Sequence, residues 1–90
     1  MERYNRSVSA VTKSSEEELV VLHTSSGNYY TLNHTGRAIW EYCSEPRSTD
    51  EIIGFIASAY DIPLERAEKD TVPYLHFLCR ENLMEKRTFP

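Results

Sequence analysis

The side chains that most often catalyse reactions or bind metals are few in this sequence of 90 residues, and they are widely spaced. Cys43 and Cys79 form no Cys-x-x-Cys pair and have no histidine at zinc-ligand spacing. His23, His34 and His76 share no spacing either. No G-x-S-x-G, H-E-x-x-H or phosphate-loop motif occurs. We therefore expect no catalytic centre, no metal site and no cofactor, and we expect both cysteines to be reduced and buried.

A short run of residues is better suited to binding a peptide through the main chain. The segment Asn28 to Leu32 is rich in Tyr and Thr, and the chain turns to helical patterning directly after it, so we expect an edge strand. Edge strands normally carry Lys, Pro or bulges that prevent pairing, and Tyr29, Tyr30 and Thr31 provide none of these. Such an edge can accept an extended peptide as an additional strand. Strand alternation directs Tyr30 and Leu32 toward the core, and Tyr29 and Thr31 to the other face.

A later amphipathic segment offers the second wall of such a peptide groove. Tyr74 and Phe77 would supply apolar contacts, and Lys69 and Asp70 would supply charges that can meet a peptide side chain. Pro73 lies among them. Because proline removes the amide that would bond the carbonyl of Lys69, we expect it to kink or divide the helix at this point.

Three β-prone runs precede the helical part of the chain and position the first wall. They are residues Val8 to Thr12, Leu19 to Thr24 and Asn28 to Leu32. Ser25-Ser26-Gly27 forms a flexible corner between the second and third runs, which predicts a hairpin. The acidic, Ser-rich residues 14 to 18 link the first run to the second. A three-stranded antiparallel meander follows.

Helix signals then appear in order. Asn33 can cap a first helix that Pro46 ends, and Ser48 with Glu51 matches the capping box of a second helix whose apolar face runs from Ile52 to Tyr60. Pro63 suits the first turn of a third helix that reaches about Leu83, with Leu64 on its buried side. Residues 84 to 90 show no clear pattern. We predict one α+β domain over residues 1–90, with its core at about 5–85: a winged helix-turn-helix with three strands followed by three helices.

Composition favours some partners over others. Ten basic and fourteen acidic residues give a net charge of −4, which opposes binding to nucleic acid and to anionic membranes. No run of about 18 apolar residues occurs, and no signal peptide is apparent. We expect a cytoplasmic protein without nucleic-acid or membrane partners.

The run from Gly27 to Trp40 resembles the PqqD family, the RiPP recognition elements. Members typically show a hairpin that ends in an aromatic pair, then Leu-Asn-x-Thr-Gly and an apolar-Trp step, which residues 29–36 and 39–40 match. Later family features correspond here to Thr49–Ile52, Tyr60-Asp61-Ile62 and Asp70, and the resemblance covers about Leu19 to Met84. Two departures are Asn82, where many members have Gly, and Pro73.

The resemblance implies a stand-alone, non-catalytic protein that captures the leader segment of a ribosomally made precursor peptide by strand addition. It would act as a peptide chaperone that presents the leader to a leader peptidase or tailoring enzyme, with lasso-peptide biosynthesis the leading pathway. The alternatives are a winged-helix DNA-binding regulator and a docking subunit for a partner enzyme. Residues 65–83, with three basic and four acidic side chains, disfavour DNA. An open edge can also pair with a second copy, so a homodimer without peptide is a further alternative.

Overall fold

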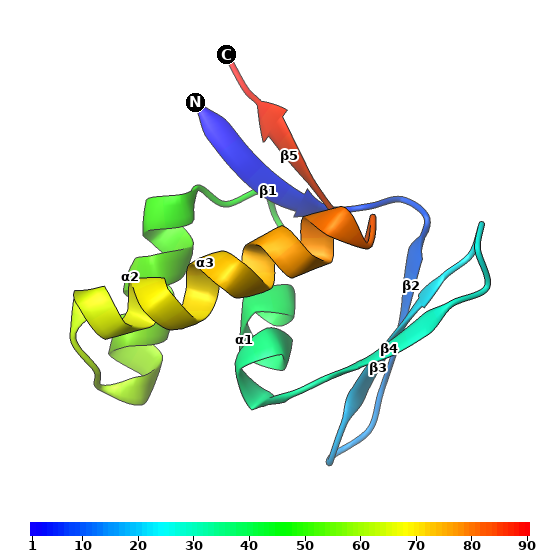
Figure 1. Cartoon of the computed structure of the whole chain (residues 1–90), viewed down its shortest axis with the longest axis horizontal. Coiled ribbons are helices and arrows are strands. Elements are labelled where there is room, and N and C mark those ends of the chain that lie inside the picture. Colours follow the sequence, from blue (N-terminus) through cyan, green and yellow to red (C-terminus); the bar gives the residue numbers. More distant parts are fainter.

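The computed structural model describes residues 1–90, which form two small sheets around three helices (Figure 1). The elements are β1 (Glu2–Arg6), β2 (Ala10–Ser14), β3 (Leu19–His23), β4 (Tyr29–Leu32), α1 (His34–Tyr42), α2 (Thr49–Tyr60), α3 (Leu64–Arg80) and β5 (Met84–Thr88). The expected α+β class, with a three-stranded antiparallel sheet followed by three helices, is confirmed. Two further strands, β1 and β5, were not expected.

The three-stranded sheet has the order β2-β3-β4, with antiparallel neighbours. Its first strand begins two residues later than predicted, because Val8 lies in the preceding turn, where it is 98% exposed. Gly27 closes the β3–β4 hairpin with a φ of 78°, a conformation that a residue with a β-carbon rarely adopts. The Gly-containing corner expected from the sequence is therefore the turn that fixes the register of β4.

The second sheet pairs the two ends of the chain, β1 with β5, in antiparallel register. Tyr4 and Met84 are the buried residues of this two-stranded ribbon, and its other residues are polar and at least partly exposed. Tyr4 also exchanges main-chain hydrogen bonds with Arg47, at 2.7 and 3.0 Å, which attach β1 to the segment between α1 and α2. A two-stranded ribbon with so little buried surface leaves no apolar alternation in the sequence, which explains why both strands were missed.

The helices begin where the sequence predicted. The Asn33 side chain accepts a hydrogen bond from the Gly36 N–H at 2.8 Å at the start of α1. At the start of α2, Ser48 and Glu51 form both bonds of the capping box, at 2.9 and 3.1 Å. The Ser48 amide lowers the pKa of the Glu51 carboxyl, because it hydrogen-bonds the ionised form.

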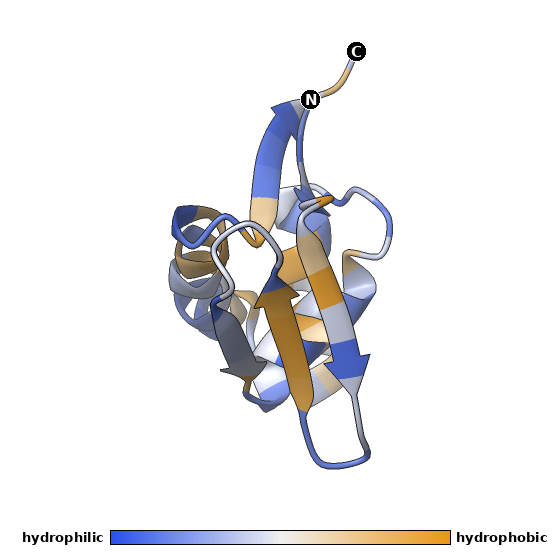
Figure 2. Ribbon diagram, turned by 90° about the vertical axis from the view of Figure 1, so that its right-hand side faces the viewer, coloured by the Kyte–Doolittle hydropathy of each residue, from blue (hydrophilic) through white to orange (hydrophobic).

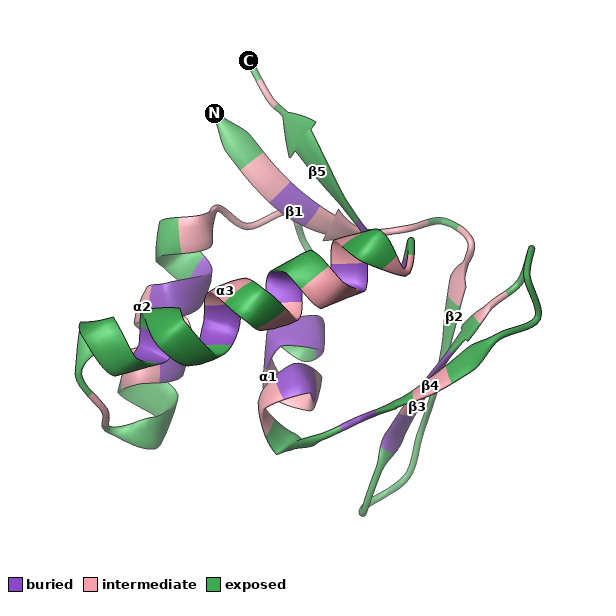
Figure 3. Cartoon of the chain, in the orientation of Figure 1, coloured by how far each residue is buried: buried purple, intermediate pink, exposed green.

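Pro73 was expected to kink or divide the helix that follows Pro63. This helix is continuous through Pro73, so it is not divided. Leu64 was expected on the buried side of this helix and is 62% exposed instead. Ala59 and Tyr60, at the end of the predicted buried face of α2, are also exposed. All three lie at the corner between α2 and α3, which extends beyond the core (Figure 3).

One core joins both sheets to the helices. Its centre contains Trp40 and Ile39 of α1 together with Leu75 and Leu78 of α3, all fully buried. The Trp40 indole N–H donates to the Thr12 hydroxyl at 3.0 Å, which fixes α1 against the inner face of the three-stranded sheet. The helix α1 is therefore anchored to the three-stranded sheet and to α3 within one core.

Candidate functional site

The strand β4 is an open edge, because it pairs with β3 on one side and with no strand on the other. At the hairpin the His23 N–H donates to the Asn28 carbonyl at 2.8 Å. Hydrogen-bonded and non-bonded pairs alternate along an antiparallel ladder, so Tyr30 holds the next bonds to β3. Tyr29 and Thr31 therefore direct their N–H and C=O groups toward the open edge, where a guest strand would meet them.

A groove of about 600 Å³ lies between the end of β4, the first turn of α1 and the exposed side of α3. It is lined by Thr31, Asn33, Thr35, Lys69, Asp70, Pro73, Tyr74 and Phe77. Six of these eight residues were expected from the sequence to contact a peptide. The chain thus brings the end of an open strand and the predicted wall of α3 to one concave site.

Three aromatic rings connect the two walls of this groove. The Tyr30 and Phe77 rings meet edge-on with centroids 6.1 Å apart, and the Phe77 and Tyr74 rings do so at 5.9 Å. The Tyr30 hydroxyl also donates to the Glu81 carboxylate at 2.9 Å, and this bond raises the pKa of the Tyr30 phenol. The distance between β4 and α3 is therefore set by packed rings and one hydrogen bond.

The third wall depends on Gly36 in the first turn of α1. A β-carbon at this position would overlap the phenol of Tyr74. Glycine is needed here for space and not for its backbone conformation, since Gly36 has an ordinary helical φ. Burial raises the pKa of the Tyr74 hydroxyl. The Thr-Gly step seen in the sequence thus permits the close approach of α1 and α3 at the groove.

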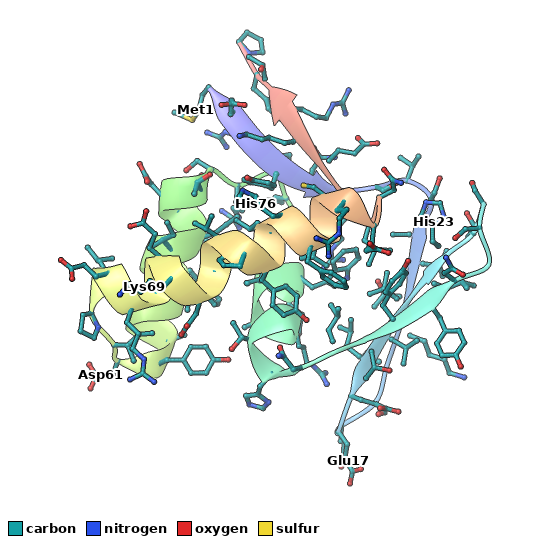
Figure 4. All side chains as sticks on the ribbon, viewed as in Figure 1. Met1, Glu17, His23, Asp61, Lys69 and His76 are labelled. Atoms are coloured by element: carbon teal, nitrogen blue, oxygen red, sulfur yellow. The ribbon has the colours of Figure 1, made fainter.

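Lys69 and Asp70 form the charged rim of the groove. Both side chains are exposed, and neither takes part in a salt bridge. Figure 4 labels Lys69 on the exposed side of α3. Pro73, which is also exposed, lies one helical turn further along. An unpaired cation and an unpaired anion on adjacent residues can each meet an oppositely charged side chain of a guest.

The remaining predicted residues do not line the groove. Leu32 is 4% exposed in the core, and Tyr30 supports the groove from its inner side through Phe77. Tyr29 is 73% exposed on the other face of the sheet, and Asn28 lies in the hairpin turn. Of these four, Tyr29 presents main-chain groups to the open edge, so it can contact a guest without its side chain entering the groove.

Asn33 and Thr35 were not predicted as site residues. The sequence signal was present, because a helix cap that follows an edge strand directly must lie at the end of that strand. Thr35 and Asp70 also border a second hollow, lined further by Ile56, Tyr60, Ile62 and Arg66. The concave surface therefore continues from β4 past the start of α1 toward the corner between α2 and α3.

The structure contains no group of three or more His, Cys, Asp or Glu side chains that could hold a metal ion. His23 ends β3, whereas His76 lies on α3 (Figure 4). Both cysteines are free thiols. Cys43 is buried, as expected, and burial raises the pKa of its thiol to about 11. Cys79 was also expected to be buried and is only half-buried. None of the three helices is long and apolar enough to cross a membrane.

Comparison with known proteins gives one family and two structures. The family model described as coenzyme PQQ synthesis protein D (PqqD) matches residues 18–84. TbiB1 in complex with the TbiA(beta) leader peptide is 27% identical, with a TM-score of 0.84 over 94% of this chain and 99% of that chain. Lasso peptide synthetase B1 complexed with the leader peptide is 21% identical, with a TM-score of 0.79 over 91% of this chain and 96% of that chain. At this identity the likeness supports the fold alone. No curated protein matches.

Proposed function

The chain belongs to the PqqD family, and from this premise we propose that it is a non-catalytic protein that binds the leader segment of a ribosomally made precursor peptide. The leader adds as a strand to the open edge of β4, and its side chains enter the groove between β4 and α3. The observation that carries the proposal is that this unguarded edge and the groove adjoin each other. The structural likeness to TbiB1, which was solved with a leader peptide, supports the same assignment.

The mechanism follows from strand addition. The free main-chain groups of Tyr29 and Thr31 bond the leader with little regard to its sequence, and the groove selects among side chains. Tyr74, Pro73 and Phe77 form an apolar surface, while Lys69 and Asp70 favour a complementary charge at the rim. Binding raises the effective concentration of the leader at a partner enzyme and needs no chemistry of its own. We infer that a leader peptidase or tailoring enzyme of a lasso-peptide pathway receives the complex.

Replacing Thr31 with proline tests strand addition directly. Proline removes the Thr31 N–H, which points to the open edge, without removing a bond to β3. We expect Thr31→Pro to fold normally and to bind a synthetic leader about 5- to 150-fold more weakly, since one lost bond and its unpaired partner cost about 1–3 kcal/mol. Isothermal titration calorimetry with a synthetic precursor leader, starting from the TbiA(beta) leader peptide found with TbiB1, measures the change.

Thr31→Ala is the matched control, because it shortens the same side chain and keeps the N–H. Because Thr31 lines the groove, its leader affinity should fall somewhat, but much less than that of Thr31→Pro. Amide exchange adds a second readout: on leader binding, the Tyr29 and Thr31 amides should gain protection, whereas the Tyr30 amide is already bonded within the sheet. Equal leader affinity for Thr31→Pro and Thr31→Ala would reject strand addition at β4.

The two alternative functions predict different results. A DNA-binding regulator would shift a DNA fragment in a salt-dependent manner, which the net charge of −4 disfavours. A docking subunit without a leader would bind its partner enzyme equally well when no peptide is present. Titration of the purified chain with leader, enzyme and DNA separately distinguishes all three.

A further inference from the structure

The strand β5 is a second open edge, in the other sheet. It pairs with β1 on one side and with no strand on the other, whereas β1 is also bonded through Tyr4 to Arg47. Only Met84 of β5 is buried, and the four residues after it are exposed. In Figure 2 the ribbon of β1 and β5 extends away from the helices and is hydrophilic along most of its length. The outer edge of β5 is therefore free to pair.

The hydrogen bonds at the end of the ribbon show which main-chain groups of β5 face this edge. The Phe89 N–H donates to the Met1 carbonyl at 2.7 Å, and the Met1 amino group donates to the Phe89 carbonyl at 2.8 Å. Bonded pairs alternate along an antiparallel ladder, so residues 85 and 87 also bond to β1. The residues whose N–H and C=O groups point outward are therefore Met84, Lys86 and Thr88.

Two charges of β5 have no partner within the chain. Glu85 and Arg87 are two residues apart, so their side chains lie on the same face of the ribbon. Both are exposed, and neither takes part in a salt bridge. Arg87 also lies directly opposite Arg3 of β1, and like charges in this arrangement are destabilising. A carboxylate supplied from outside the ribbon, next to Arg87, would relieve this repulsion.

A second copy of the chain supplies that carboxylate when two β5 strands pair antiparallel about a two-fold axis at Lys86. Glu85 of each copy then lies opposite Arg87 of the other. Pairing centred on residue 85 would instead place two glutamates opposite each other, and pairing centred on residue 87 would place two arginines opposite each other. The charges that usually guard a strand edge thus disfavour the neighbouring registers and permit this one.

Lys86 lies opposite its own copy in this register, which is the one unfavourable contact. Its ammonium group is already paired with the Glu2 carboxylate at 3.5 Å and lies over the Tyr4 ring. Lys86 and its neighbours Glu85 and Arg87 point to opposite faces of the ribbon. The two lysines therefore meet as neutralised pairs, away from the attractive contacts.

We propose that the chain forms a two-fold dimer through β5, in which the two ribbons join into one four-stranded sheet of the order β1-β5-β5-β1. Two Glu85–Arg87 pairs cross the interface. The inference goes beyond the proposed function and does not depend on it. The dimer keeps both β4 edges open, because no residue of the ribbon lines the groove. The contact is small and polar, so we expect a dissociation constant on the order of 100 μM.

Charge reversal at the two unpaired residues tests the register of the dimer. The variants are Glu85→Arg and Arg87→Glu, and Glu16→Arg is the matched control, because it makes the same change on an exposed glutamate in the β2–β3 turn. Sedimentation velocity at low salt measures the dimer at protein concentrations from about tenfold below to about tenfold above the expected constant. Circular dichroism and thermal unfolding show that each variant is folded.

We expect the native chain and Glu16→Arg to dimerise equally. Glu85→Arg and Arg87→Glu should each dimerise at least about tenfold more weakly, because two attractive pairs become two repulsive ones. An equimolar mixture of these two variants should form a dimer again, since the two arginines of one chain then face the two glutamates of the other. On dimerisation of the native chain, the Lys86 and Thr88 amides should gain protection from exchange, whereas the Glu85 and Arg87 amides are already bonded within the ribbon.

Three results would overturn the inference and leave the proposed function intact. The first is a native chain that stays monomeric at the highest concentration. The second is a dimer that Glu85→Arg and Arg87→Glu form as well as the native chain does, or a mixture of these folded variants that fails to associate. The third is a dimer that Thr31→Pro abolishes, which would place the contact at the edge of β4.

Discussion

At the scale of single residues, the groove depends on the absence of a side chain at Gly36. The Tyr74 phenol occupies the space that a β-carbon at this position would need. In Gly36→Ala the Tyr74 ring must move, and its edge contact with Phe77 changes with it. We expect the free energy of unfolding to fall by about 1–3 kcal/mol, the usual cost of overpacking, and leader affinity to fall as well. Urea unfolding and calorimetric titration measure the two effects.

Gly54 supplies the control for this prediction. It lies within α2, and a β-carbon there would meet no atom within 4 Å. Gly54→Ala should therefore raise the free energy of unfolding by about 0.5–1 kcal/mol through helix propensity, with leader affinity unchanged. If Gly36→Ala proved as stable as Gly54→Ala, the contact with Tyr74 would not limit the packing of α1 against α3.

The side chains of α3 that line the groove could be predicted from the sequence better than their surroundings. Asp70, Pro73, Tyr74 and Phe77 recur at helical spacing, so a single helix face had to present them together. Strand alternation also separated the two faces of β4. The close approach of Tyr74 to Gly36 could not be predicted, because it depends on the crossing of α1 and α3, which no local pattern encodes.

At the scale of elements, the groove wall of α3 contains a residue that is unfavourable for a helix. Pro73 cannot donate to the Lys69 carbonyl, and both residues border the groove. We expect Pro73→Ala to raise the free energy of unfolding by about 1–3 kcal/mol, because it restores a helical bond. Leader affinity should fall severalfold, because the apolar wall loses the pyrrolidine ring. Thermal unfolding and calorimetric titration test whether the two quantities change in opposite directions.

An exposed residue of the same helix provides the comparison. His76 lies on α3 outside the groove lining, so His76→Ala should change stability by only about 0.5 kcal/mol and leave the leader affinity unaltered. A Pro73→Ala chain that binds the leader like the native one would show that the ring is not part of the binding surface.

Element boundaries were predictable wherever a side chain itself forms the boundary. Asn33, Ser48 and Gly27 act through their own hydrogen bonds or φ angle, so the sequence signal and the structural cause are the same. The predicted burial of Leu64 and Tyr60 was wrong for a different reason. Apolar spacing defines a helix face along its whole length, but the corner between α2 and α3 extends past the elements that could cover it.

At the scale of the whole molecule, the arrangement is flat, with extents of 37 × 36 × 19 Å. The ribbon of β1 and β5 and the three-stranded sheet attach to different parts of the helical layer (Figure 1). No residue of the ribbon lines the groove. The sequence could not predict the ribbon, because its strands are polar and lie at opposite ends of the chain. We infer that the ribbon stabilises the domain without taking part in leader binding.

Removing the Tyr4 side chain tests this division of roles. Tyr4 is 5% exposed and belongs to the common core, so Tyr4→Ala should lower the free energy of unfolding by about 3 kcal/mol. A domain of this size is stable by about 5–15 kcal/mol, so most molecules should remain folded in the absence of denaturant. Glu2→Ala, on the same strand, removes only a surface pair with Lys86 and should change stability by less than about 1 kcal/mol. Leader affinity, measured at low temperature by calorimetry, should be the same for both variants. A tenfold loss of leader affinity in folded Tyr4→Ala would show that the ribbon and the groove are coupled through the core.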